Sequence, residues 1–274
     1  MTDWHLSAAA RTSRGLVRAR NMDGFFLDGR SLQPEEMNHG GSMWEENEAP
    51  SQLYAVCDGL GSDATGQWAS YEITRLLQIL RDAYPDGMTD SEALFSVGRL
   101  SDRIHRLAGT DRPPTGAALA MCLWLRGTLR VLNVGNCRVY RLRAGKLTQL
   151  SVDHTETQRM IDLGMETPYL ARMSPRRHLL TQYVGMDSGN RAFQPALSAV
   201  LAVRPRDRYL LCTDGLYDMV EDEEIRKTLL RARDAAEAAE RLVQQALDNG
   251  GRDNATVVCL TVHGYRRVWR LRQG

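Results

Sequence analysis

The chain has 274 residues, of which 43% are hydrophobic and 25% are charged, so it has ample apolar material for a core and is not a disordered polypeptide. Its 35 basic and 34 acidic side chains leave a net charge of +1, which gives no electrostatic reason to expect binding to nucleic acid or to a membrane surface. No window approaches the roughly 18 consecutive apolar residues of a membrane-spanning helix, and the N-terminus lacks an apolar signal-peptide core, so we expect a cytoplasmic protein.

Apolar or alternating runs bounded by turn residues predict many strands. In chain order they are WHLSAAA (4–10), GLVRA (15–19), DGFFL (23–27), QLYAVC (52–57), AALAMCLWL (117–125), TLRVLNVG (128–135), CRVYRLR (137–143), RYLLCT (208–213) and ATVVCLTVH (255–263). Apolar residues three or four positions apart predict helices between them. These are 66–84, 91–108, 153–164, 222–232 and 235–250.

Two pairs of these helices are consecutive in the sequence, and the strands cluster between the pairs. This order favours an α+β fold of antiparallel sheets covered by helical hairpins over a doubly wound parallel sheet. We expect a single domain over residues 1–274. Residues 30–52 are rich in Pro, Gly, Asn and Glu and have no steady period, so a long loop is expected there. Its Trp44 and neighbouring glutamates either contact a partner or are solvated.

Three aspartates stand at the ends of predicted buried strands. Asp58 follows QLYAVC, Asp214 follows RYLLCT, and Asp253 precedes the last run. Each alone is typical of an Asx-turn or a helix cap. If the fold brings them together, the cost of carboxylates beside a core indicates a compensating cation, and oxygen ligands favour Mg²⁺ or Mn²⁺ over zinc.

A series of short motifs occurs along nearly the whole chain. They are RxxNxD (18–23), AVCDGLGSxxxGxxAS (55–70), TGAA (115–118), NVGNCRVYRL (133–142), DHT (153–155), CTDGLYD (212–218) and GRDNAT (251–256). In this order and spacing they resemble the motifs of the metal-dependent Ser/Thr protein phosphatases, the type 2C family. The residues within the motifs look more like those of its bacterial members than those of its animal members. Each motif alone is weak, but the ordered set is specific.

The resemblance implies an α-β-β-α sandwich of two antiparallel sheets with a binuclear Mg²⁺ or Mn²⁺ centre in a cleft at one end. By the pattern of the family, Asp58 would bridge both ions and the carbonyl of Gly59 would bind one of them. Asp214 and Asp253 would complete the other. These are the positions that the resemblance assigns to metal ligands.

The resemblance also implies the reaction. Asp23 would hold metal-bound water, and Arg18 would grip the substrate phosphate, for which a planar guanidinium is suited. Water activated by two ions would attack phosphorus of phosphoserine or phosphothreonine in a protein substrate. A bacterial signalling role follows by the same resemblance, with a cognate Ser/Thr kinase as partner and no membrane or nucleic-acid partner.

Several positions depart from the family pattern. Met22 replaces a common Glu near the waters of the second ion, and Asn136 replaces the acid that resembles a ligand of a third, weaker metal. Gln67 stands where Glu is common, and Leu60 stands where His or Met is found, so no general acid is assigned.

A flap beside the cleft is expected at about 162–178. Its arginines either meet acidic phosphopeptide sequence or form a basic solvated loop; they are Arg172, Arg176 and Arg177.

Other functions find less support. Cys137 and Arg143 have the Cys-x5-Arg spacing of a tyrosine phosphatase, but they lie in a strand pattern instead of a phosphate loop. No Gly-x-Ser-x-Gly elbow occurs, and the six histidines show no metal-ligand spacing. The main alternative is a catalytically silent domain that binds a phosphoprotein or a regulatory partner, which Met22 and Asn136 motivate. The retained acids argue against it, because they repel one another without metal.

Overall fold

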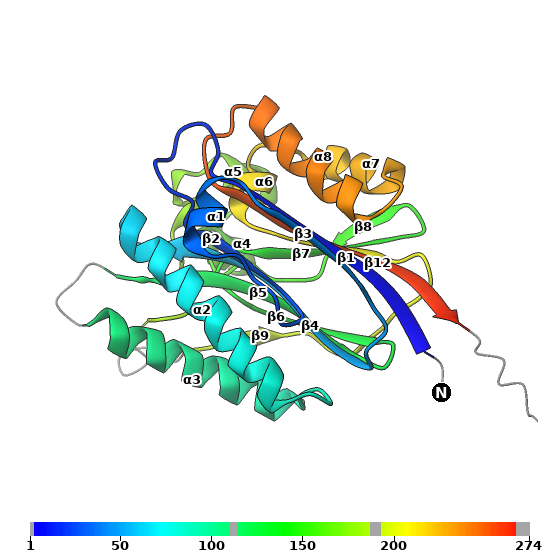
Figure 1. Ribbon diagram of the computed structural model, residues 1–274. Coiled ribbons are helices and arrows are strands. Elements are labelled where there is room, and N and C mark those ends of the chain that lie inside the picture. The colour runs from blue at the N-terminus through cyan, green and yellow to red at the C-terminus, as the bar shows by residue number, and fades with distance from the viewer. Residues whose placement is uncertain (1–2, 110–113, 187–192, 267–274) are drawn as a thin grey trace, which may run out of the picture.

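Two antiparallel β-sheets lie face to face in the computed structural model, which describes residues 3–109, 114–186 and 193–266 (Figure 1). The first sheet has the order β3 (Ser42–Asn47), β1 (Asp3–Ser13), β12 (Ala255–Arg266), β11 (Arg208–Cys212), β7 (Arg138–Arg143) and β8 (Lys146–Gln149). The second has the order β10 (Leu201–Ala202), β6 (Thr128–Val134), β5 (Gly116–Leu125), β4 (Ser51–Leu60) and β2 (Asp23–Leu27), with β9 (Ala196–Leu197) also paired to β6.

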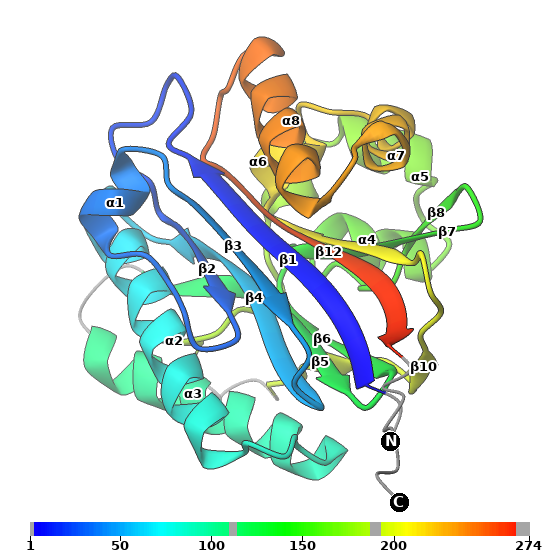
Figure 2. The ribbon, with the colours of Figure 1, turned by 45° about the vertical axis from the view of Figure 1, so that its right-hand side comes forward.

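Pairs of helices cover the outer faces of both sheets (Figure 2). The second sheet is covered by α2 (Asp63–Ala83) and α3 (Asp90–Ala108), and the first by α7 (Asp222–Arg231) and α8 (Ala235–Asp248). The predicted α-β-β-α sandwich with helical hairpins is confirmed.

The central strands are buried on both faces, which explains why they are almost continuously apolar in the sequence. In β1, Leu6 packs between the two sheets while Ala9 packs beneath the helices of the first sheet. In β4, Val56 faces the inter-sheet core and Ala55 faces α2 and α3. Each fully buried Leu or Val contributes about 1.5–3 kcal/mol, so this layered core supplies most of the driving force for the fold.

The long helices begin at residues that satisfy their free backbone N–H groups. Ser62 precedes α2 and Thr89 precedes α3, and each accepts from the backbone N–H three residues later. Asp234 does the same for α8, with an N–H of Glu237 at 2.8 Å. These caps fix the starts of the helices within three residues of the boundaries that the apolar periodicity predicts.

The predicted strand at 15–19 is wrong, because this segment is a turn between β1 and β2. Gly15 has φ +78°, and a Cβ atom there would overlap the backbone of Asp253 and Gly251. The N–H of Leu16 donates to the carbonyl of Gly251 at 2.7 Å. The apolar side chains of Leu16 and Val17 are exposed, so this apolar run belongs to a turn and not to a buried strand.

The predicted loop at 30–52 is also wrong, since it contains α1 (Pro34–Asn38), β3 and the first residues of β4. The side chain of Glu36 accepts from the N–H of Gln33 at 2.8 Å and closes a capping box at the start of α1. Strand β3 pairs with the edge of β1, and its side chains alternate between partly buried and exposed. That pairing is between segments distant in sequence, so no local period marks it.

Shorter elements lie near the end of the sandwich where β4, β11 and the start of β12 meet. They are α4 (Glu156–Asp162), which lies inside the predicted helix at 153–164, α5 (Pro168–Met173), α6 (Asp214–Tyr217) and the 3₁₀ turn η1 (Pro175–His178). Among the residues that the structure describes, no helix combines the length and the apolarity needed to cross a membrane.

Candidate metal centre

A cleft of about 540 Å³ opens at this end of the two sheets. The strand ends and turns described above deliver its acidic and basic side chains. The predicted residues that line it are Arg18, Asp58, Gly59, Asn136, Asp214 and Asp253. Asp23 lies beneath the cleft, on β2, and is opposite Asp58 in the pairing of β2 with β4. The structure therefore brings together all of the side chains that the sequence singled out for this centre.

Rigid backbone elements position the three acids of the cleft. Asp58 is near the end of β4, Asp214 is the first residue of α6 directly after β11, and Asp253 comes just before β12. The next residue, Asn254, links the walls of the cleft. Its side chain accepts from the N–H of Met22 at 2.7 Å and donates to the carbonyl of Arg20 at 2.9 Å. Sequence reasoning did not identify this positioning role, because the contacts span most of the chain.

Gly59 allows close backbone packing beside Asp58. A Cβ atom at this position would overlap the carbonyl oxygen of Gly66 and lie 2.7 Å from that of Met22. The N–H of Gly59 donates to the carbonyl of Met22 at 3.1 Å. Only glycine fits here, so the main chain of Gly59 lines the cleft without a side chain in front of it.

Mutual repulsion and burial perturb the acids when no cation is present. Burial raises the pKa of Asp58 well above its usual range, and the charges of Asp214, Asp23 and Asp253 add to this effect. Burial also raises the pKa of Asp23 to about 8, although the hydroxyl of Thr213 donates to its carboxylate at 2.8 Å. Burial also acts on Asp214, but the hydrogen bond and charge of His178 outweigh it and lower the pKa of Asp214, so Asp58 and Asp23, but not Asp214, are shifted toward the neutral acid.

This donor set fits hard divalent cations. Carboxylate oxygens, with a backbone carbonyl beside them, are the ligands that Mg²⁺ and Mn²⁺ prefer, and the cleft leaves room for water. A bound dication would offset the repulsion that raises the pKa of Asp58. Asp58, Gly59, Asp214 and Asp253 are therefore the residues that would hold it.

Arg18 lies at the rim of the same cleft. Its guanidinium is 2.6 Å from the carboxylate of Asp253, and 41% of its side chain is exposed. The turn at 15–19 carries it there, so the segment that was mistaken for a strand has a positional role. An exposed guanidinium above a group of carboxylates can meet an anion that enters from solvent.

The predicted flap contributes a histidine that sequence reasoning missed. His178 lies with Nδ1 3.2 Å from Asp214 and Nε2 3.3 Å from Asp218. Burial opposes protonation, but the hydrogen bond with Asp214 outweighs it and raises the pKa of His178. Of the flap arginines, Arg177 pairs with Asp218 at 3.1 Å in the cleft, whereas Arg172 pairs with Glu221 outside it. No local signal could find His178, because its partners are more than 35 positions away.

The departures from the family pattern have defined contacts. Asn136 donates its side-chain amide to the carboxylate of Asp214 at 3.0 Å. Met22 is buried and lines the cleft. Gln67 is buried and donates to the carbonyl of Asn21 at 2.9 Å, so it braces the segment before β2.

The tyrosine-phosphatase alternative does not fit. Cys137 is fully buried, and burial raises the pKa of its thiol well above the usual range, which disfavours the reactive thiolate. Arg143 forms two hydrogen bonds with Asp207, at 2.7 and 2.6 Å. All five cysteines are free and buried.

Comparisons with known proteins agree on one family. The sequence profile of protein phosphatase 2C matches residues 39–250. The serine/threonine protein phosphatase PstP of Mycobacterium tuberculosis is 34% identical over 262 residues, which are 95% of this chain and 46% of PstP, so the chain spans about half the length of that relative.

Solved structures of this family superpose on the chain. The catalytic domain of PstP in complex with two manganese ions has a TM-score of 0.72 and 31% identity, and the match covers 95% of this chain and 99% of that domain. The phosphatase MsPP of Mycobacterium smegmatis in complex with cacodylate has a TM-score of 0.75 and 30% identity, over 93% of this chain and 97% of that one.

Proposed function

The chain belongs to the protein phosphatase 2C family, and from this premise we propose that it hydrolyses phosphoserine and phosphothreonine in proteins with the help of two Mg²⁺ or Mn²⁺ ions. The observation that carries the proposal is the meeting of Asp58, Asp214 and Asp253 with Arg18 in one cleft. We also propose that residues 1–274 form a single phosphatase-like domain.

Each ligand has a distinct place in the proposed centre. Asp58 is opposite Asp23 in the pairing of β2 with β4 and would contribute to both ions, the carbonyl of Gly59 would serve one ion, and Asp214 and Asp253 would serve the other. When bound, the ions lower the pKa of water and neutralise charge on the phosphoryl group. The structure of PstP with two manganese ions supports the same number here.

The remaining residues act on substrate and water. Arg18 forms charge-assisted hydrogen bonds to the phosphate, which first requires its exchange from Asp253. Asp23 accepts a hydrogen bond from Thr213 and orients water at the floor of the site once it is ionised. Hydrolysis then proceeds by attack of water on phosphorus without a side-chain nucleophile, in agreement with the burial of Cys137.

The comparisons and the cysteines also bear on the biological setting. The named relatives are bacterial Ser/Thr phosphatases, which supports a bacterial signalling role opposite a cognate Ser/Thr kinase. The free, buried cysteines suit the cytoplasm.

A second candidate function is a silent domain that binds phosphoprotein. Asn136 favours it, since its amide donates to Asp214 and adds no negative charge for an additional ion. The complete set of acids favours the enzyme, because their burial and mutual repulsion have a cost that bound metal would offset.

The experiment is release of phosphate from a phosphothreonine peptide by tag-free protein, with Mn²⁺ and with EDTA. We expect phosphate release with Mn²⁺ and none with EDTA. Asp86→Asn, at an exposed aspartate in the turn between α2 and α3, is the matched control and should keep the wild-type rate. Peptide binding without phosphate release, in protein shown to hold Mn²⁺, would favour the silent domain.

A further inference from the structure

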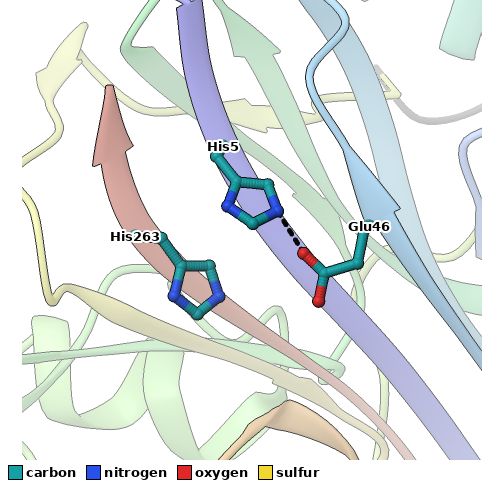
Figure 3. Close-up of side chains that lie close together, drawn as sticks. All are labelled: His5, Glu46 and His263. Atoms are coloured by element: carbon teal, nitrogen blue, oxygen red, sulfur yellow. Dashed lines mark ion pairs between the residues drawn. The ribbon is translucent and has the colours of Figure 1, made fainter. Parts of the chain in front are cut away.

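A cluster of two imidazoles and one carboxylate lies on the first sheet, far from the cleft (Figure 3). His5 comes from β1, Glu46 from β3 and His263 from β12. One ligand atom from each lies within 4.8 Å of the other two, and Nε2 of His5 forms an ion pair with Glu46. We propose that this cluster is a second metal site, which takes a borderline transition-metal dication such as Zn²⁺.

Strand pairing holds the three side chains together. Strand β1 lies between β3 and β12, with Ser7 opposite Glu46 and His5 opposite Gly264. A bulge between His5 and Leu6 shifts the register, so that His263 comes beside His5. The two rings stack with their centroids 4.8 Å apart. The positions are therefore set by three paired strands and not by mobile loops.

The ligand types differ from those of the cleft. Two ring nitrogens and one carboxylate oxygen suit Zn²⁺, Ni²⁺ or Cu²⁺, whereas the oxygen ligands of the cleft suit Mg²⁺ or Mn²⁺. Ligand atoms around tetrahedral zinc lie about 3.4 Å apart, so small side-chain rotations would close the present cluster around an ion. The side chain of Glu46 is 50% exposed, so it can rotate toward the imidazoles.

The surroundings supply a further donor and a neutral ring. Oγ of Ser7 lies 2.8 Å from Nε2 of His263, so a hydroxyl oxygen stands beside the ligand atoms as a fourth partner, alternative to water. Burial lowers the pKa of His263, and the nearby His5 and Arg208 lower it further, although Glu46 opposes them. The lowered pKa favours the neutral ring, which is the form that binds a metal.

The cluster is separate from the catalytic centre in space. Ser13, at the cleft end of β1, pairs with Ala255 just after Asp253, and His5 is eight positions earlier on the same strand. At about 3.3 Å per residue the cluster is roughly 26 Å from that end. This end of β1 and β12 extends past α7 and α8 (Figure 2). A bound ion would tie edge strand β3 to the first and last strands of the structure, which is a structural role.

The test is zinc content after equilibrium dialysis of tag-free, full-length protein in excess Mg²⁺, which occupies the oxygen ligands of the cleft. All samples carry His178→Gln, so that the histidine of the cleft cannot bind zinc. The expected result is one zinc ion per chain, lost in His263→Gln and weakened at least tenfold in Glu46→Gln. The control is His39→Gln, at the exposed histidine that follows α1 and whose Nδ1 lies 2.7 Å from the backbone carbonyl oxygen of Glu35, and it should keep the ion.

Two readouts separate this site from the proposed phosphatase. With His178 restored, His263→Gln should keep the Mn²⁺-dependent turnover of wild type. In the His178→Gln background, Cu²⁺ bound to the cluster should show hyperfine coupling to two imidazole nitrogens, and His263→Gln should reduce this to one. Equal zinc content in His263→Gln and its parent would overturn the proposal and leave the cluster as an ion pair with a stacked ring. Failure of turnover in every sample would affect the phosphatase proposal alone.

Discussion

Replacing Asp23 with Asn should stabilise the metal-free protein, although it removes a residue of the proposed active site. Asp23 is 3% exposed, and burial raises its pKa from the ordinary 3.8 to about 8. At pH 7 the folded, metal-free chain must therefore hold this acid protonated, whereas the unfolded chain has it ionised. Three pH units at about 1.4 kcal/mol per unit correspond to about 4 kcal/mol of lost stability.

The dependence on pH gives the prediction its sign. Because the pKa is higher in the folded state, the penalty is absent below about pH 4, grows as the pH rises, and is complete above about pH 8. Asn keeps an oxygen that accepts from Thr213 and carries no charge. We expect a gain in the free energy of unfolding of about 2 to 4 kcal/mol at pH 7 and a gain close to zero at pH 4.

The assay is urea unfolding in EDTA at pH 4, 7 and 9, followed by tryptophan fluorescence. Asp86→Asn is again the control, since its exposed carboxylate should show no such gain. Saturating Mn²⁺ should cancel or reverse the advantage of Asp23→Asn, because the ionised acid then faces cations. A gain that does not grow with pH, or a loss at pH 7 in EDTA, would refute the electrostatic reasoning.

Two further substitutions probe other parts of the account. Asn136→Asp places a carboxylate beside Asp214, so Mn²⁺ affinity or turnover should rise a few-fold. A Mn²⁺ titration identical to that of wild type would show that this position is unimportant. Arg143→Ala leaves the carboxylate of Asp207, which is 1% exposed, without its ion pair and should cost about 3 kcal/mol in urea unfolding. Arg226→Ala, which breaks an exposed pair with Glu223, should cost under about 1 kcal/mol, and equal losses in both variants would contradict the role assigned to burial.

The sequence predicts the parts of the fold that local periodicity encodes. Long elements with a clear apolar pattern are found close to their predicted places, because the period of their buried side chains is visible in the local sequence. They are strands β4, β5 and β12 and helices α2, α3, α7 and α8. Strand β3 was missed because its extended conformation depends on pairing with β1. Residues 15–19 were misassigned because contacts with Gly251 hold them in a turn.

In the candidate site too, local motifs identify some residues, whereas others are recognised only from tertiary contacts. Asp58 and Asp214 were identified because short motifs surround them, and the fold brings them to one cleft with Asp253. His178 was missed because it is distant in sequence from its partners Asp214 and Asp218, and only the folding of the flap over the cleft brings them into contact. The pairing of Arg18 with Asp253 is likewise visible only in three dimensions.

The most direct test of the central claim counts Mn²⁺ and turnover in the same samples of wild type and Asp58→Asn. The charges of Asp214, Asp23 and Asp253 act on Asp58, and in the proposed centre its carboxylate would serve both ions. The account predicts two Mn²⁺ ions per chain and hydrolysis of a phosphothreonine peptide in wild type, with fewer ions and no hydrolysis in the variant. A variant that keeps both ions, or that hydrolyses the peptide at the wild-type rate, would contradict the proposed two-metal centre.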